Sequence, residues 1–482
     1  MGSREIVMAQ PHIPILRNGE PYHSVEKIEL LHHATGEPVA SVSQANSGMV
    51  VRDIHRMADD VLERFTVRQL LDICRDAAGR FMNDALPLGE GRQTFDDYVS
   101  RLSATTGMPV VYCRSNATKI QHVMAEMETV LRGLTRGFDL TILDRGHGHH
   151  AGGTLSYYRA GRKFGAVLPS NSPGVHSLWV PAIALKAPVI LKPGREEPWT
   201  PYRILQALMA AGVPREAFGF YPTDHAGAGE LLRATDRSML FGDTSTTQPW
   251  KNDARVQLHG PGYSKILLGD DTADDWERHV DMMVSSIAAN GGRSCINASA
   301  VWTPRHGRKI AEALAGELAA VEALSADDPR AAIAAFANPT MAERISASID
   351  AGLRDPGAED VAERLRGSPR LVTRGRCAWL LPTIIRCDDR EHPLCHREFL
   401  FPFASVVECP TAEMLEAIGP TLVATALTQD QKIIDALMAS RHVDRLNVGP
   451  IPTWRISWDQ PHEGNLFEHL YRQRAFQMEP AA

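Results

Sequence analysis

One eight-residue segment holds the side chain best suited to do chemistry. Residues 290–297 read Asn-Gly-Gly-Arg-Ser-Cys-Ile-Asn, and they follow a helix-like run from Trp276 to Ile287. Glycine adopts backbone conformations that are closed to other residues, so the Gly-Gly pair can form a tight turn that presents Cys295 at a fixed angle. A cysteine on such a turn is a nucleophile where its surroundings favour the thiolate. A free cysteine is also a common small core residue, so this segment alone leaves both interpretations open.

Six further segments accompany Cys295 in a fixed order along the chain. Taken together, they resemble the motifs of the aldehyde dehydrogenase superfamily from about residue 36 to about residue 449, which is most of the sequence. The asparagine, Lys-Pro, cysteine and glutamate positions match closely, whereas several neighbouring positions do not. The segments lie at 168–173, 189–193, 241–245, 257–260, 398–402 and 446–449, and read Leu-Pro-Ser-Asn-Ser-Pro, Val-Ile-Leu-Lys-Pro, Phe-Gly-Asp-Thr-Ser, Gln-Leu-His-Gly, Glu-Phe-Leu-Phe-Pro and Leu-Asn-Val-Gly.

The resemblance implies covalent catalysis by Cys295. An aldehyde has no good hydride donor on carbon until a nucleophile adds to it. A thiolate forms a thiohemiacetal, whose hydrogen can leave as hydride to a nicotinamide, and the product is a thioester. Asn171 matches the family asparagine that stabilises the developing alkoxide together with the Cys295 backbone N–H. The alternative for Asn171 is an ordinary turn residue before Ser-Pro.

Position 257 departs from the family pattern. Residues 257–260 read Gln-Leu-His-Gly, where many members have Glu-Leu-Gly-Gly and use that glutamate to activate water against the thioester. Gln257 cannot accept a proton at neutral pH, so hydrolysis should be slow and a better nucleophile, such as the thiol of coenzyme A, should take the acyl group. Acylating members of the superfamily also lack this glutamate. Another residue, Glu398 or His259, could instead serve as the base.

The resemblance also places Lys192 on the adenine-side ribose of a nicotinamide cofactor. Lys192 ends an apolar strand, and ligands of parallel sheets sit at the carboxyl ends of strands. Arg195 stands where many NAD-preferring members have glutamate. A guanidinium favours a 2′-phosphate, so the sequence leans toward NADP, unless Arg195 is a surface charge and Glu196 turns in instead.

Two other cofactor contacts follow from the resemblance. Thr244 and Ser245 occupy the family's pyrophosphate turn, where a strand gives way to a helix N-terminus. In this chain the glycine of that turn is displaced by one position, and Asp243 adds a negative charge that is unfavourable near a pyrophosphate unless it caps the helix. Glu398 matches the family ligand of the nicotinamide ribose, although the aromatic position beside it is altered.

The alternation of strands and helices predicts an α/β protein with a parallel sheet. The resemblance implies an aldehyde dehydrogenase-like fold, with a Rossmann-type nucleotide-binding domain at 1–267, a catalytic α/β domain at 268–445, a C-terminal oligomerisation tail at 446–482 and an oligomerisation hairpin near 150–166. A polar loop is expected at 147–150, a solvated helix pair at 309–335 and a surface loop at 355–369. In the first domain we expect strands at 165–168, 188–192, 218–221 and 238–241, and helices at 175–185, 202–211 and 227–235.

Composition narrows the class of protein. The 482 residues are 44% hydrophobic and 23% charged, as in soluble globular proteins, and require two or three domains. A net charge of -7 argues against a nucleic-acid partner. Seven cysteines without paired spacing, no signal peptide and no long apolar run predict a cytoplasmic protein without a membrane span. The spacing of the Cys and His residues between 377 and 396 fits no common zinc module, so no metal is expected.

The sequence therefore predicts an NAD(P)-dependent oxidoreductase acting on a small-molecule aldehyde, as a homodimer or homotetramer. The favoured reaction interconverts an aldehyde and an acyl-CoA, with coenzyme A as co-substrate. The first alternative is a hydrolysing aldehyde dehydrogenase that makes a carboxylic acid. The second is a non-catalytic member that binds a nucleotide or a partner protein, against which the intact Cys295 and Asn171 argue. The identity of the aldehyde cannot be read from the sequence.

Overall fold

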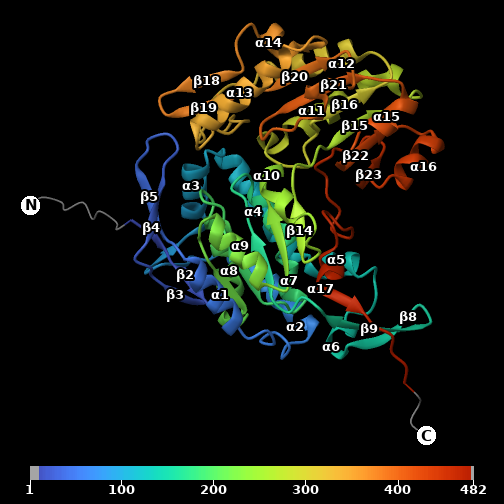
Figure 1. Ribbon diagram of the computed structural model, residues 1–482. Helices are drawn as coiled ribbons and strands as arrows, with labels where there is room; N and C mark the ends of the chain where they lie inside the picture. Colours follow the sequence, from blue (N-terminus) through green and yellow to red (C-terminus); the bar gives the residue numbers. More distant parts are fainter. Residues whose placement is uncertain (1–9, 479–482) are drawn as a thin grey trace, which may run out of the picture.

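Two seven-stranded sheets organise the chain (Figure 1). The computed structural model describes residues 10–478. Five neighbouring strands of the first sheet are parallel, and β2 and β3 extend it in antiparallel register. In spatial order its strands are β14 (Val256–His259), β13 (Arg237–Phe241), β10 (Phe164–Val167), β11 (Val189–Lys192), β12 (Phe218–Phe220), β2 (Ile15–Arg17) and β3 (Glu20–Tyr22).

The strands of the first sheet follow from their composition. Runs such as Val189–Lys192 are almost continuously apolar and buried, as expected for strands covered on both faces. The predicted strands and two of the predicted helices are present, the helices as α8 (Trp199–Ala210) and α9 (His225–Ala234). The helix expected at 175–185 is wrong. The chain forms a 3₁₀ helix, η1 (Pro173–Leu178), and a short α7 (Pro181–Ala184), because Pro181 has no N–H to continue a helix from the preceding turn.

The second sheet is also mostly parallel and runs from Lys265 to Val448. Helices α11 (Val280–Ala288), α12 (Gly307–Leu318) and α14 (Val361–Arg366) pack against it. The buried apolar side chains of this sheet and its helices form two clusters that are separate from the core of the first sheet. In spatial order its strands are β17 (Ala358–Asp360), β20 (Thr383–Cys387), β21 (Phe403–Glu408), β16 (Ala300–Thr303), β15 (Lys265–Leu268), β22 (Thr421–Leu427) and β23 (Val443–Val448).

The hairpin forms one strand earlier than expected. β9 (Gly153–Arg159) pairs with β8 (His147–His150) and with the tail strand β24 (Tyr471–Gln473), whereas β10 joins the first sheet. Residues 147–150 are thus a strand and not a polar loop, because β9 supplies their backbone partners. Before β24, the tail forms the short helix α17 (Leu466–Leu470), and in Figure 1 the red tail runs back from the second sheet to the first.

Two other surface segments differ from expectation. Only α12 forms within 309–335, and the stretch after it packs Ile333 and Ala335 into a small core with Trp379 instead of forming a second helix. The segment 355–369 is not simply a loop, because it contains β17 and α14, whose Val361 and Ala362 are buried. Across residues 10–478, no helix is long and apolar enough to cross a membrane.

Candidate active site

Cys295 lies on a strained turn between α11 and β16. Three consecutive residues before it, Asn290, Gly291 and Gly292, have φ values of 55°, 66° and 67°. A side-chain carbon at position 292 would lie 2.3 Å from the backbone of Phe401, so only glycine fits there. The Gly-Gly pair is therefore required by a close backbone approach as well as by the turn. It fixes the path of the backbone that leads to Cys295.

A reciprocal pair of hydrogen bonds holds the Cys295 turn against the end of β10. The Asn171 Nδ2 donates to the Arg293 carbonyl at 3.0 Å, and the Arg293 Nε donates to the Asn171 carbonyl at 3.0 Å. The Asn171 Oδ1 is buried without a partner among the described residues. An amide NH₂ carries two hydrogens, so Asn171 keeps one that could reach an oxyanion next to Cys295.

A carboxylate from the tail reaches the Cys295 sulfur. The Cys295 Sγ donates to the Glu463 Oε1 at 3.2 Å, and the other carboxylate oxygen, Oε2, lies 2.8 Å from the His259 Nδ1. His259 ends β14, its ring stacks on Phe241 at 4.4 Å, and its Nε2 is buried without a partner in the described part of the chain. The result is a continuous chain of contacts from Cys295 through Glu463 to His259.

Charge and burial set the resting protonation states of Cys295 and Glu463. Burial, the nearby Glu463 and Glu398 carboxylates, and the hydrogen bond to Glu463 raise the pKa of Cys295 well above its usual value. Burial opposes ionisation of Glu463 too, but the contacts with His259, His462 and the Cys295 thiol outweigh it and lower the pKa of Glu463 to about 2. The resting site thus holds a thiol and a carboxylate in hydrogen-bond contact.

Gln257 does not face the cysteine in this arrangement. Its Nε2 donates to the main-chain oxygen of Glu463 at 2.8 Å, and its Oε1 is buried without a partner among residues 10–478. Gln257 therefore holds the tail segment that carries Glu463 in place.

Two cavities meet at Cys295. The first, which we call the tail cavity, has a volume of about 410 Å³ and is bounded by α4 (Val110–Ala125), η1 and the tail residues 454–463. The second, the sheet cavity, has a volume of about 510 Å³ and lies at the carboxyl ends of β10, β13 and β14. Cys295 and Val175 line both. A group on Cys295 is thus reachable from either side.

The sheet cavity contains only one of the five predicted cofactor residues, Glu398. Asn171, Glu196 and Glu398 line it, whereas Lys192, Arg195, Thr244 and Ser245 do not. Lys192 is half-buried at the end of β11, and burial lowers its pKa although Glu196 and Asp224 oppose this effect. Arg195 is exposed, and its guanidinium has no hydrogen bond or ion pair with any described residue.

The altered turn after β13 caps a helix. Asp243 is the N-cap of the short α10 (Thr244–Thr247): its Oδ1 accepts from the Thr246 N–H at 2.9 Å and from the Ser245 hydroxyl at 2.7 Å. These contacts lower the pKa of Asp243 and occupy the Ser245 hydroxyl.

Glu398 is tied to the backbone rather than left free. Its carboxylate accepts from the Gly262 N–H at 3.2 Å and from the Tyr263 N–H at 2.6 Å. Burial raises its pKa to about 7, against the effect of these two hydrogen bonds and of Lys265.

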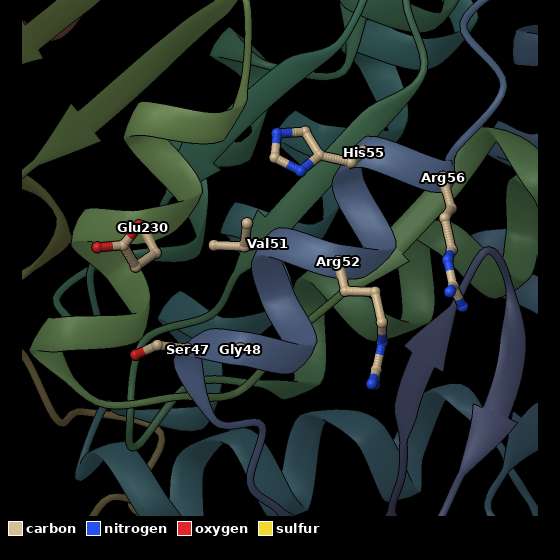
Figure 2. A pocket seen from close by; sticks show the side chains of 7 residues that line it. All are labelled: Ser47, Gly48, Val51, Arg52, His55, Arg56 and Glu230. Atoms are coloured by element: carbon tan, nitrogen blue, oxygen red, sulfur yellow. The ribbon is translucent and has the colours of Figure 1, made fainter.

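A further hollow lies away from these residues, between α1 (Ser47–Arg56) and α9. Figure 2 shows Glu230 on α9 on the same side of α1 as Ser47, Val51 and His55, whereas the Arg52 and Arg56 side chains extend to the other side of α1. None of the sequence-predicted site residues lines it. In the described part of the chain, no cluster of three or more His, Cys, Asp or Glu side chains is placed to hold a metal ion.

Sequence reasoning missed Glu463 as a site residue. The segment His-Glu-Gly at 462–464 has no helical or strand periodicity, and it lies 168 positions from Cys295 in the sequence. Gln257 is the indirect signal in the sequence, because the loss of a carboxylate at this position indicates that another carboxylate must act as the base. The sequence indicates His259 only as an alternative base, and no motif marks Lys119, which lines the tail cavity.

Comparison with known proteins identifies the family. The model of the aldehyde dehydrogenase family matches residues 22–419, and the chain belongs to that family, as its motifs predicted. The aminoacetaldehyde dehydrogenase of Pseudomonas aeruginosa is 27% identical over 198 residues, a match that spans 39% of this chain and only 40% of that relative.

Solved structures show the same fold. A 3,6-anhydro-L-galactose dehydrogenase in complex with NAP superimposes with a TM-score of 0.76 at 16% identity, covering 96% of this chain and 99% of the other. An indole-3-acetaldehyde dehydrogenase complexed with NAD⁺ gives 0.75 at 17% identity and covers 96% of each chain. The α/β fold expected from the sequence is thus confirmed.

Proposed function

We propose that this protein oxidises an aldehyde with NAD(P) and releases a carboxylic acid. The Cys295 thiol loses its proton to solvent, the thiolate sulfur adds to the aldehyde carbon, and the resulting oxyanion is held by Asn171 and the Cys295 N–H. A nicotinamide held in the sheet cavity would supply the hydride acceptor, and loss of hydride from the substrate carbon would leave a thioester on Cys295. Water then attacks the thioester carbon, Glu463 takes the water proton, and the acid leaves as the thiol re-forms.

One observation carries this proposal: Cys295 stands where two cavities meet. Oxidation by hydride transfer requires the substrate carbon to have the nucleophile on one side and the hydride acceptor on the other. The tail cavity is open to an aldehyde, and the sheet cavity lies where parallel α/β sheets bind nucleotides. A buried structural cysteine would not need openings on two sides.

The sheet cavity fits a nicotinamide cofactor. It follows the ends of three adjacent parallel strands, and a buried polar atom on its wall, the His259 Nε2, has no partner within residues 10–478. Glu398 on its wall would hold one ribose, and Lys192 and Thr244, which lie outside the wall of this cavity, would hold the other ribose and the pyrophosphate. Arg195, whose exposed guanidinium has no partner within residues 10–478, supports a preference for NADP.

Glu463 supports water, rather than a thiol, as the final acceptor. General bases act from about 2.6–3.2 Å or through one water, and Glu463 lies at that distance from Sγ. The thiol's hydrogen bond is one of the contacts that lower the pKa of Glu463. Acylation of Sγ removes that hydrogen bond and leaves the Glu463 Oε1 free to accept a hydrogen bond from water.

The acyl-CoA reaction remains the second candidate, because Gln257 supplies no carboxylate at the position where hydrolytic relatives use one. A product assay decides between them: several aldehydes are incubated with NAD or NADP, with and without coenzyme A, and the acid and thioester are measured by mass spectrometry. We expect acid without coenzyme A. A thioester that forms only with coenzyme A would favour the second candidate. The absence of NAD(P)H with every aldehyde and both nucleotides would refute aldehyde oxidation.

The tail and hairpin also support an assembly. β8, β9 and β24 form a separate three-stranded sheet outside the two large ones, and this is the sheet that we expect to pair with a second copy in a homodimer or homotetramer. Light scattering on the full chain would measure the mass, and a monomer at micromolar concentration would contradict the expectation.

A further inference from the structure

We propose that the substrate is an aldehyde that also carries a carboxylate, and that Lys119 binds this carboxylate in the tail cavity. The inference rests on the proposed function and names the class of aldehyde that the site accepts. It starts from a lysine that the reaction itself does not require.

Lys119 reaches the wall of the tail cavity from α4. A side-chain carbon at position 174, which is glycine, would lie 3.4 Å from the Lys119 Nζ and 2.9 Å from the Asn116 Oδ1. The ammonium therefore lies over the start of η1, where Gly174 leaves space, and it lines the same cavity as Cys295. An anion bound there would sit in the cavity that leads to the nucleophile.

The Lys119 ammonium has no partner of its own within residues 10–478. Its Nζ makes no hydrogen bond or ion pair with a described residue, and burial lowers its pKa to about 8, although Glu463 and Cys295 oppose this effect. Buried charges are normally paired, because removing an ammonium from water is costly. A ligand carboxylate would supply the missing counter-charge with a charge-assisted hydrogen bond.

The other charged groups of the tail cavity favour an anion as well. Arg455 lines it and is exposed, with no side-chain partner among the described residues. Glu463 is the one acidic side chain on the described wall, and its two oxygens are already engaged by Cys295 and His259. His462 is neutral, since burial lowers its pKa to about 3.

Lys119 has one competing role, which the test must separate. Its charge acts on Cys295 and favours the thiolate, so losing it could slow the reaction of every aldehyde. An effect on the thiolate would be the same for neutral and anionic substrates. An effect on binding would appear only for substrates that carry a carboxylate, and mainly in KM.

The experiment compares aldehydes with a terminal carboxylate, three to six carbons long, with neutral alkanals of the same length. The enzymes are the wild type, Lys119→Met, Lys119→Arg and a matched control, Arg114→Met, which removes a positive charge from the exposed side of the same helix. We expect the wild type to prefer a carboxyl-bearing aldehyde by tenfold or more in kcat/KM. Lys119→Met should lose about 10- to 100-fold on these aldehydes, as expected for one charge-assisted hydrogen bond. Its kcat/KM for neutral alkanals should change less than threefold.

Lys119→Arg should keep most of the preference, and Arg114→Met should keep all of it. Equal losses of Lys119→Met on both classes of aldehyde would overturn the inference and assign Lys119 to Cys295. A wild type without any preference for carboxyl-bearing aldehydes would overturn it too, while NAD(P)H formation from neutral aldehydes would leave the proposed function intact. The absence of NAD(P)H with every aldehyde would instead be a failure of the proposed function.

Discussion

Replacing Glu463 by Gln tests the contact between the tail and the nucleophile. Glutamine keeps the size of the side chain and can still bond His259, but it cannot take a proton. The Cys295 Sγ to Glu463 Oε1 distance of 3.2 Å places the carboxylate within range of a water on the thioester. General-base help is worth about 10²–10⁴-fold, or about 2.7–5.4 kcal/mol, so steady-state acid formation should fall by that factor.

The first step should respond in the opposite direction. The Glu463 charge is one cause of the raised pKa of Cys295, so its removal lowers that pKa and makes the thiolate easier to form. In stopped-flow measurements, Glu463→Gln should give a burst of NAD(P)H equal to the enzyme concentration, followed by slow turnover. The pH dependence of the burst rate should move to lower pH than in the wild type.

The matched control is Glu468→Gln, an exposed carboxylate of the same tail that pairs with Arg136. It should behave as the wild type in both phases. The reasoning fails if Glu463→Gln keeps steady-state acid formation within threefold of the wild type. It also fails if the burst is lost together with turnover while the variant is folded and still binds nucleotide, because Glu463 would then be needed before the thioester forms.

Three further outcomes are expected. Cys295→Ala should abolish aldehyde-dependent NAD(P)H formation while nucleotide binding, measured by fluorescence, persists; more than a few per cent of residual rate would exclude Cys295 as the nucleophile. Arg195→Glu should shift the NADP/NAD ratio of kcat/KM toward NAD by about tenfold or more, since one charge-assisted contact contributes roughly 1.5–3 kcal/mol. The control variant Glu196→Gln should leave the ratio near the wild-type value. An unchanged ratio in Arg195→Glu would show that Arg195 is a surface residue without a contact to the cofactor. Gln257→Glu should not accelerate acid formation, because a carboxylate cannot donate the hydrogen bond by which Gln257 holds the main-chain oxygen of Glu463. A faster rate of acid formation without coenzyme A would show that the residue at position 257, and not Glu463, limits hydrolysis.

Local sequence was sufficient for the parts of the protein that depend on neighbours in the chain. The largely apolar runs at 189–192 and 238–241 are strands because continuous burial suits a parallel sheet, and the Gly-Gly pair before Cys295 marks a turn with positive φ. Local pattern was insufficient where a partner decides the conformation. Residues 147–150 are polar but form a strand, because β9 supplies their hydrogen bonds.

The same distinction between local sequence and tertiary contacts holds for the residues of the site. The sequence by itself identified Cys295 and Asn171 as candidates, because each lies in a short segment that matches a motif of the family. It also showed that position 257 lacks a carboxylate, but not what compensates for it. Only the tertiary structure placed Glu463 against Cys295 and His259, and Lys119 in the same cavity, because these residues lie on separate elements that meet only when the tail folds back across the first sheet. No periodicity or spacing in the chain encodes a contact of that kind.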